Sequence, residues 1–302
     1  MYQNFEAIIA AVRRQPKKKT ICVAGAASDK MMHLAHELQT QNICRMILVG
    51  DEARIRALAE QEGVELADVK LIHAVEAEEI ARLAVTEVSS GCADVYVKGS
   101  MNTSDFLRSV LNKEVGLRTG SKLSVLTCYE VPGQRKLFFL TDGGMVVAPT
   151  LEDKAAIVTN AVRVLHNMGI ALPKVAILSS NEKVSEKIPS TVDAQALCRM
   201  AEEHALPAAI YEGPIAFDVA MRPDAAAEKK IESRVSGEVD LFLVPNIETG
   251  NCLGKAIGYF GGGDTAGLVI GAAKPVVMSS RAASIRGKLA SVAWALLACG
   301  EE

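Results

Sequence analysis

Small hydroxyl groups and a guanidinium follow an apolar stretch close to the C-terminus of this 302-residue chain. The stretch at 275–278 reads PVVM, and Ser279, Ser280 and Arg281 come directly after it. If this stretch is a strand and a helix follows, backbone N–H groups at the helix start carry a partial positive charge. An arginine fork matches phosphate oxygens, and serine hydroxyls can donate to a phosphate or an oxyanion. The pattern indicates an anion site; its alternative is a helix capped by Ser280 or Ser284 beside a surface Arg281.

A second stretch repeats this arrangement of strand, turn and donor-rich helix start. Residues 95–111 read VYVKGSMNTSDFLRSVL, in which a glycine allows close backbone approach to a ligand and a lysine adds charge. We expect this stretch to contribute to the same kind of anion site. The residues concerned are Lys98, Gly99, Ser100, Asn102, Thr103, Ser104 and Arg108.

Two further predicted strand ends carry carboxylates. Residues 137–150 read LFFLTDGGMVVAPT, which places Thr141 and Asp142 after an apolar run, although a plain Asp-Gly turn is the simpler interpretation. Residues 244–267 follow another buried strand, and a capped helix with a glycine-rich exit turn would also explain their composition. The polar candidates in this last stretch are Asn246, Glu248, Asn251, Lys255 and Asp264.

Other motifs support less chemistry. His33 and His36 have a spacing that can share a metal, but no third ligand follows nearby, so we expect no metal site. The turn at 25–28 lacks the GxGxxG pattern and the chain has no P-loop motif, which argues against nicotinamide and ATP chemistry. Cys252 has no histidine in its stretch that would make it a nucleophile.

The composition favours a cytoplasmic enzyme. A formal net charge of -3 offers no field for nucleic acid or an anionic membrane, so an anion site has to be local. Hydrophobic residues make up 49% of the chain and aromatic ones only 4%, as in parallel sheets covered by helices. The cysteines lack a CxxC pair and predict reduced thiols. The chain start lacks the apolar core of a signal peptide, and no apolar run is long enough to span a membrane.

Short β-branched runs alternate with helical patterns along the chain, which predicts an α/β fold with doubly wound sheets. We place a domain boundary near residue 148, where Pro149 precedes a long helical pattern and the alternation restarts. The segment from 270 onward holds one strand and one helix, too little to fold alone, so it must join one of the lobes. The strands predicted before the boundary lie at 20–26, 45–50, 69–74, 93–99, 123–128 and 136–143.

From about residue 93 to the C-terminus, the order of several unusual blocks resembles the phosphate acetyl/butyryltransferase family. The blocks are KGSMNTSDFLR, FLTDGG, PKVAILSSNEKVSEKIPSTVDAQAL, GPIAFDVAM, DLFLVPNIETGNCLGKAIGYF and AGLVIGAAKPVVMSSRA. The stretches EKIPSTVDAQALCRMAE and EGPIAFDVA look most like the phosphate butyryltransferase branch. The residues before 93 carry less of the resemblance.

The resemblance implies reversible transfer of an acyl group between the thiol of coenzyme A and inorganic phosphate, which gives an acyl phosphate. It implies no cofactor, no metal and no covalent acyl-enzyme. The implied fold is similar to the isocitrate and isopropylmalate dehydrogenases, with a cleft between two α/β domains, one of 1–148 with 270–302 and the other of 149–269. Family members are commonly homo-oligomers built on dimers, and an acyl kinase encoded nearby would consume the acyl phosphate.

The resemblance also implies roles for single residues. Arg281 would bind phosphate, and Ser280 would donate to the reacting thioester or orient the thiol. Thr103 and Arg108 would hold phosphate or the coenzyme. Phosphate acetyltransferases have a carboxylate six residues after this arginine, where this chain has Gly287. A base-free route through a lowered thiol pKa is open, and the candidates for a base are Asp142, Glu248 and Asp264.

We expect a short-chain substrate, butyryl first of all. Acetyl or branched acyl groups are the alternatives, because selectivity for a methylene is worth only about 1 to 3 kcal/mol. An alternative of another class is a sensor that binds acyl-CoA without turnover. The Ser280–Arg281 pair favours catalysis, whereas Gly287 leaves room for sensing. A decarboxylating dehydrogenase would need a metal-binding carboxylate cluster and a nicotinamide site, and the sequence indicates neither.

Overall fold

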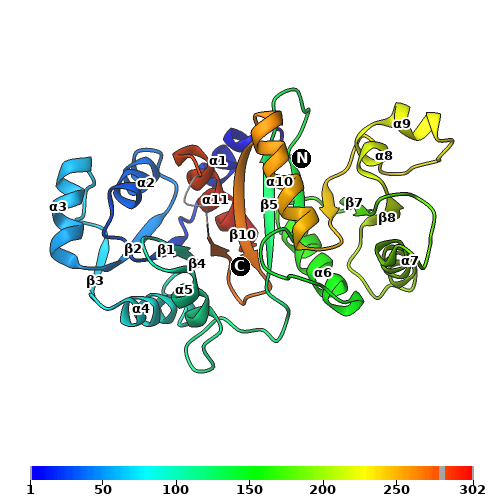
Figure 1. Ribbon diagram of the computed structural model, residues 1–302. Helices are drawn as coiled ribbons and strands as arrows, with labels where there is room; N and C mark the ends of the chain where they lie inside the picture. The colour runs from blue at the N-terminus through cyan, green and yellow to red at the C-terminus, as the bar shows by residue number, and fades with distance from the viewer. Residues whose placement is uncertain (1, 279–282, 301–302) are drawn as a thin grey trace. The chain divides into compact units, whose positions relative to one another are not determined.

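The computed structural model describes residues 2–278 and 283–300, and its contacts divide the chain into two compact units (Figure 1). The first unit holds residues 2–121 and the described residues from 266 onward, and the second holds 122–265. The sequence placed these boundaries near 148 and 269. The first division comes earlier because β6 (Phe138–Thr141) pairs with β9 (Leu241–Leu243), which belongs to the second unit.

The first unit is built on strands in the order β3-β2-β1-β4-β11-β10. Neighbouring strands run parallel except β10 and β11, which are antiparallel. Thus β1 lies between β2, the next strand along the chain, and β4, which comes later. The strands are β1 (Thr20–Ala24), β2 (Arg45–Gly50), β3 (Lys70–His73), β4 (Val95–Lys98), β10 (Asp264–Ile270) and β11 (Val276–Val277).

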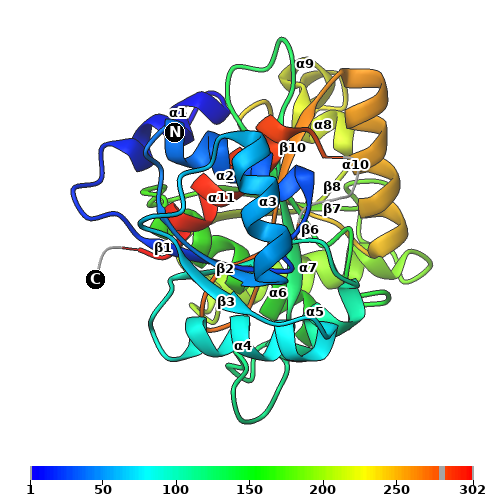
Figure 2. The same ribbon diagram turned by 90° about the vertical axis from the view of Figure 1, so that its left-hand side faces the viewer.

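Helices cover both faces of this sheet, with α1, α2, α3 and α11 on one face and α4 and α5 on the other (Figures 1 and 2). In α1 the apolar residues Phe5, Ile8 and Val12 recur at helical spacing and are buried. The last helix, α11, is buried over most of its length, including Trp294. The helices are α1 (Phe5–Arg13), α2 (Asp29–Thr40), α3 (Glu52–Glu62), α4 (Ala77–Ser89), α5 (Thr103–Val110) and α11 (Ile285–Ala298).

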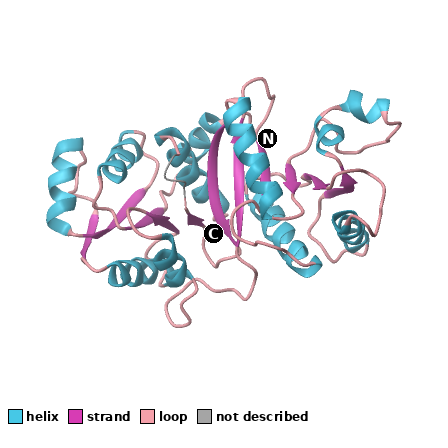
Figure 3. Cartoon of the chain, viewed as in Figure 1, coloured by secondary structure: helices cyan, strands magenta, loops and turns pink. Residues whose placement is uncertain are grey.

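The second unit also combines strands with helices (Figure 3). Its strand order is β5-β6-β9-β7-β8, in which only the β5–β6 pair is antiparallel. Its core includes Tyr129, which stacks on Phe138, and Phe242, which meets Phe138 edge-on. Its remaining strands are β5 (Ser124–Glu130), β7 (Lys174–Leu178) and β8 (Ile210–Ile215), and its helices are α6 (Leu151–Asn167), α7 (Pro189–Glu202), α8 (Phe217–Met221), α9 (Pro223–Glu228) and α10 (Ile247–Gly261).

The α/β class predicted from the alternation of strands and helices is confirmed, and all six strands predicted before residue 148 form. The hairpin of β5 and β6 makes the architecture mixed rather than purely parallel. Within the part of the chain that the structure describes, no helix is both long and apolar enough to cross a membrane.

Candidate functional site

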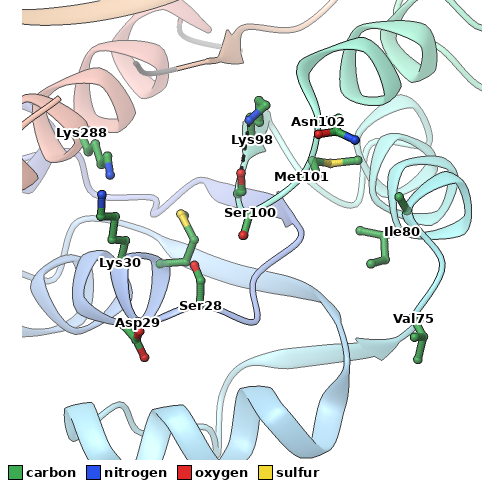
Figure 4. Close-up of a pocket in the computed structure, with 13 residues that line it drawn as sticks. Ser28, Asp29, Lys30, Val75, Ile80, Lys98, Ser100, Met101, Asn102 and Lys288 are labelled. Atoms are coloured by element: carbon green, nitrogen blue, oxygen red, sulfur yellow. Dashed lines mark hydrogen bonds between the residues drawn. The ribbon is translucent and has the colours of Figure 1, made fainter. Parts of the chain in front are cut away.

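A cavity of about 700 Å³ lies in the first unit beside the ends of β1 and β4 (Figure 4). We call it the β1–β4 cavity. The chain leaves β1 toward β2 on one side, while β4 pairs with β1 on the other, so this is a switch point of the sheet where ligands bind in open α/β folds. The described residues that line the cavity are Ser28, Asp29, Lys30, Met31, Val75, Ala77, Ile80, Lys98, Gly99, Ser100, Met101, Asn102 and Lys288.

Three helices begin at the β1–β4 cavity. The starts of α2, α4 and α5 contribute Asp29, Ala77 and Asn102 to its lining. The residues that precede the three helices make no side-chain capping hydrogen bond to the first turn. Because the first N–H groups of a helix have no partner within the helix, these three turns offer donors and partial positive charge to an anion.

The Lys98–Gly99–Ser100 turn is held tightly against the end of β1. The N–H of Gly99 donates to the carbonyl of Ala24 at 2.8 Å, and that of Ser100 donates to the carbonyl of Gly25 at 2.7 Å. A Cβ on Gly99 would lie 2.8 Å from the Ala24 oxygen and nearer still to the Gly25 oxygen. Only glycine fits this close approach, which packs the turn against the backbone that follows β1 and places it in the cavity wall. The expected approach of Gly99 to a ligand stays a prediction.

Three other residues expected from the same stretch, Thr103, Ser104 and Arg108, do not line the cavity, and Ser104 is exposed. Thr103 is the first residue of α5 and is exposed. Arg108 lies further along α5, is exposed, and pairs with Asp105 at 3.1 Å. The predicted part of Thr103 and Arg108 in substrate binding therefore has no support from the cavity lining and rests on the family resemblance.

Lys30 and Lys288 add two cations that the sequence analysis did not identify. Their side chains point toward one another across the cavity (Figure 4). Lys288 is only 7% exposed. Burial, together with the positive charge of Lys30, lowers the pKa of the Lys288 ammonium below its ordinary value. One signal was present, since Lys288 is a charged residue directly before the largely apolar stretch 289–298 of α11.

In the second unit, Asp142 closes a turn after β6. It is 3% exposed, and its Oδ1 accepts hydrogen bonds from the N–H groups of Gly144 and Met145 at 2.8 and 3.1 Å. Its Oδ2 accepts from the N–H of Val146 at 2.9 Å. Burial raises the pKa of the Asp142 carboxyl, and the backbone hydrogen bonds oppose that rise. Thr141, fully buried, donates to the carbonyl of Val125 at 2.9 Å.

The first turns of α10 pack directly on the Asp142 turn. A Cβ on Gly143 would lie 2.8 Å from the carbonyl carbon of Gly250, so the two backbones meet where only glycines fit. The side-chain amide of Asn251 donates to the Gly143 carbonyl at 3.3 Å. Glu248 and Lys255 are exposed on the same helix. Asn246 caps the helix by accepting from the N–H of Thr249 at 2.9 Å.

The central pair of the sequence analysis, Ser280 and Arg281, lies outside the described residues, as does Ser279. The structure does settle which serine caps the last helix, because Ser284 Oγ accepts the N–H of Gly287 at 2.9 Å. Capping therefore does not require Ser280.

No group of three or more potential metal ligands of the types His, Cys, Asp and Glu gathers in the described part of the chain. His33, considered earlier as one of a metal-binding pair, lies 3.2 Å from the Glu62 carboxylate, and His36 lies against the carbonyl of Gly63. Cys252 is an exposed free thiol.

Comparisons with a family model, with characterised relatives and with solved structures all match the same kind of protein. Residues 4–85 and 76–296 match the family described as phosphate acetyl/butaryl transferase. The chain is 38% identical to the phosphate butyryltransferase of Clostridium acetobutylicum over 100% of both chains. It is 37% identical to a phosphate acetyltransferase of Rhizobium meliloti over 97% of this chain and 93% of that one. A branched-chain phosphotransacylase from Enterococcus faecalis superposes with a TM-score of 0.82 and 29% identity, covering 94% of this chain and 100% of its own.

Proposed function

Because this chain belongs to the phosphate acetyl/butyryltransferase family, we propose that it transfers a short acyl group reversibly between coenzyme A and inorganic phosphate, with butyryl as the preferred group. One observation carries the proposal, the similarity to a phosphate butyryltransferase over the full length of both chains. The chain is an enzyme of the phosphate acyltransferase type, and coenzyme A and phosphate are its substrates. Acetyl and branched acyl groups are the alternatives, in line with the names of the other two relatives.

The charge of the β1–β4 cavity supports this chemistry. A phosphate oxygen attacks the thioester carbonyl while the coenzyme A thiolate leaves, so two anions meet at one carbon whichever way the reaction runs. Cationic donors that are already in place offset this repulsion. We assign Lys98, Gly99 and Ser100 to the binding of phosphate or coenzyme A, because they line the cavity. Thr103 and Arg108 are assigned to the same task from the resemblance.

The assignment of Ser280 and Arg281 also comes from the family resemblance. Arg281 binds the phosphate with its two-pronged guanidinium, and Ser280 donates to the thioester carbonyl or orients the thiol. A positive side chain in that place stabilises the charge that develops on phosphate and carbonyl oxygen together.

In the second unit, we assign Thr141, Glu248, Asn251 and Lys255 to substrate binding, since they gather around the Asp142 turn and along α10. The hypothesis that Asp142 is the base for the thiol stays a prediction. Its geometry favours a positioning role, because each carboxylate oxygen already accepts a backbone N–H.

We further propose a homo-oligomer built on dimers. Tyr259 and Phe260, at the end of α10, are 86% and 93% exposed, and a second copy covering them would remove large apolar side chains from water. Several expectations stay predictions. They are the kinship with isocitrate and isopropylmalate dehydrogenases, the cleft between two domains, a reaction without metal or other cofactor, the cytoplasmic location and the link to an acyl kinase.

The proposal is tested by thiol release from a panel of acyl-CoAs, acetyl through hexanoyl with branched members, in the presence and absence of phosphate. We expect phosphate-dependent release that is fastest with butyryl-CoA and insensitive to a chelator. Arg281→Ala should lower turnover by orders of magnitude without unfolding the protein. Arg56→Ala is the control, because Arg56 is an exposed arginine of α3 that pairs only with Glu52 among the described residues.

Two outcomes would contradict the proposal. Tight binding of acyl-CoA without release would make the protein a sensor. Wild-type turnover in Arg281→Ala would remove the assignment of the phosphate-binding arginine, even if the acyl transfer itself were observed.

A further inference from the structure

Lys288 is a buried residue whose ammonium borders the cavity, and no described residue supplies a counter-charge to it. It is 7% exposed, and in the part of the chain that the structure describes neither a hydrogen-bond acceptor nor a carboxylate is paired with its Nζ. Lys154 in the second unit offers a direct contrast, because it is buried to the same degree and pairs with Asp193 at 2.6 Å. Because this ammonium borders the cavity and faces a second cation, Lys30, a ligand in the cavity can supply the missing negative charge.

The surroundings of Lys288 increase the positive charge instead of balancing it. Lys30, from the start of α2, points toward it across the cavity, and Lys98 lines the same cavity (Figure 4). Among the described lining residues Asp29 is the one carboxylate, and its side chain points away from the two facing lysines in Figure 4. The starts of α2, α4 and α5 add partial positive charge. Several cationic groups therefore converge on one space.

The size and the walls of the β1–β4 cavity limit which class of ligand can bind there. At about 700 Å³ it is far larger than one phosphate group needs. One part of its wall is apolar, with Met31, Val75, Ile80 and Met101. The cavity thus suits a phosphoryl group attached to a larger organic body, and a dianionic phosphoryl group matches two ammonium ions and helix N–H donors.

We propose that Lys288 and Lys30 form a phosphoryl-binding subsite of the β1–β4 cavity. The inference rests on the proposed function in one respect, because that function names two substrates that carry phosphoryl groups, inorganic phosphate and coenzyme A. In the subsite the two ammonium groups bind the phosphoryl oxygens from the sides of α11 and α2. The ligand also relieves the repulsion between the two lysines.

The first test separates a ligand site from a structural lysine. Lys288→Met keeps the apolar stem of the side chain and removes the charge. Because that charge is unpaired, the variant without ligand should unfold at the same temperature as the wild type or a higher one. Lys154→Met is the matched control: it leaves Asp193 without its partner, so it should lower the unfolding temperature and leave every KM unchanged. A marked loss of stability in Lys288→Met would overturn the proposal.

The second test identifies the source of the phosphoryl group. The KM values of wild type, Lys288→Met and Lys30→Met are measured for inorganic phosphate, coenzyme A and dephospho-coenzyme A. We expect a rise of roughly 10- to 100-fold for the substrate bound at the subsite, as for loss of one charged hydrogen bond. A rise for phosphate alone assigns the subsite to inorganic phosphate. A rise for coenzyme A alone assigns it to the 3′-phosphate, and a rise for both coenzymes assigns it to the diphosphate.

A direct binding measurement tests the subsite separately from the proposed acyl transfer. Ligand-induced shifts of the unfolding temperature are measured with phosphate and with coenzyme A, which requires no turnover. Loss of a shift in Lys288→Met supports the subsite even if acyl transfer is never observed. Unchanged KM values and unchanged shifts in both lysine variants would overturn the subsite while leaving an observed acyl transfer intact.

Discussion

The Asp142 turn gives the sharpest prediction, because its carboxylate accepts three backbone N–H groups while almost fully buried. The perturbation is Asp142→Asn, which keeps the size of the side chain and removes one acceptor and the charge. The amide oxygen can retain the hydrogen bonds from Gly144 and Met145. The new amide NH2 then faces the N–H of Val146, and two donors point at each other.

The magnitude follows from these contacts. A buried N–H left without an acceptor costs about 1 to 3 kcal/mol. The two remaining hydrogen bonds lose their charged acceptor, which removes roughly 1 to 2 kcal/mol more. Loss of the buried charge offsets part of this, since burial is the main cause that raises the pKa of the Asp142 carboxyl. We therefore expect Asp142→Asn to lower the free energy of unfolding by about 2 to 3 kcal/mol.

Urea unfolding followed by far-ultraviolet circular dichroism, at matched protein concentration, measures this change. The control is Asp51→Asn, because Asp51 caps α3 by accepting only the N–H of Arg54 among the described residues, and asparagine caps a helix equally well. That variant should stay within about 0.5 kcal/mol of the wild type. Wild-type stability in Asp142→Asn would refute the reasoning about the turn.

The same variant decides between a positioning residue and a base. If Asp142 positions the turn, the folded variant loses turnover but keeps the pH dependence of kcat/KM. If it is the base for the coenzyme A thiol, the rise of kcat/KM with pH flattens. A stable variant with a flattened profile would therefore favour the base.

Three further predictions concern the close approaches and the lysines. Gly99→Ala should cost about 1 to 3 kcal/mol of stability and raise a substrate KM, because the new methyl overlaps backbone oxygens; wild-type values in urea unfolding and kinetics would contradict the close approach. Gly143→Ala should cost a similar amount, about 1 to 3 kcal/mol, as its methyl meets the backbone of α10, and an unchanged unfolding midpoint would speak against this contact. Lys288 faces Lys30 and shares the cavity with Lys98, and burial lowers the pKa of its ammonium below the ordinary lysine value of 10.5. The KM of the ligand at the subsite should therefore rise with pH in the wild type. The same rise in Lys288→Met would show that deprotonation of Lys288 is not its cause.

Much of the chain before residue 148 could be predicted because its signals are local. The six strands before residue 148 were recognised from β-branched runs, and each forms within a few residues of its predicted place. The strand ends after β4 and β6 were recognised from glycine and polar residues that follow apolar runs. Gly99 and Gly143 illustrate the reason. At each position another backbone segment leaves no room for a side chain, so the residue has to be glycine and is visible in the sequence.

The boundary between the units could not be read in the same way. The long helical pattern after Pro149 suggested a division near 148, whereas the chain divides at 121. The decisive interaction is the pairing of β6 with β9, which joins Phe139 to Leu241 across a long stretch of sequence. Strand pairing of this kind depends on register in three dimensions and leaves no mark on local periodicity.

By itself, the sequence determined the α/β class, the order of the strands along the chain, the glycines at their ends and the resemblance to an acyltransferase family. Only the tertiary structure decided which charges meet. It buried Asp142 under three backbone N–H groups, and it brought Lys288 of α11 to face Lys30 of α2. Segments that are distant in the chain bury a group and bring other charges close to it. Burial and neighbouring charges set the pKa of the group and its need for a partner.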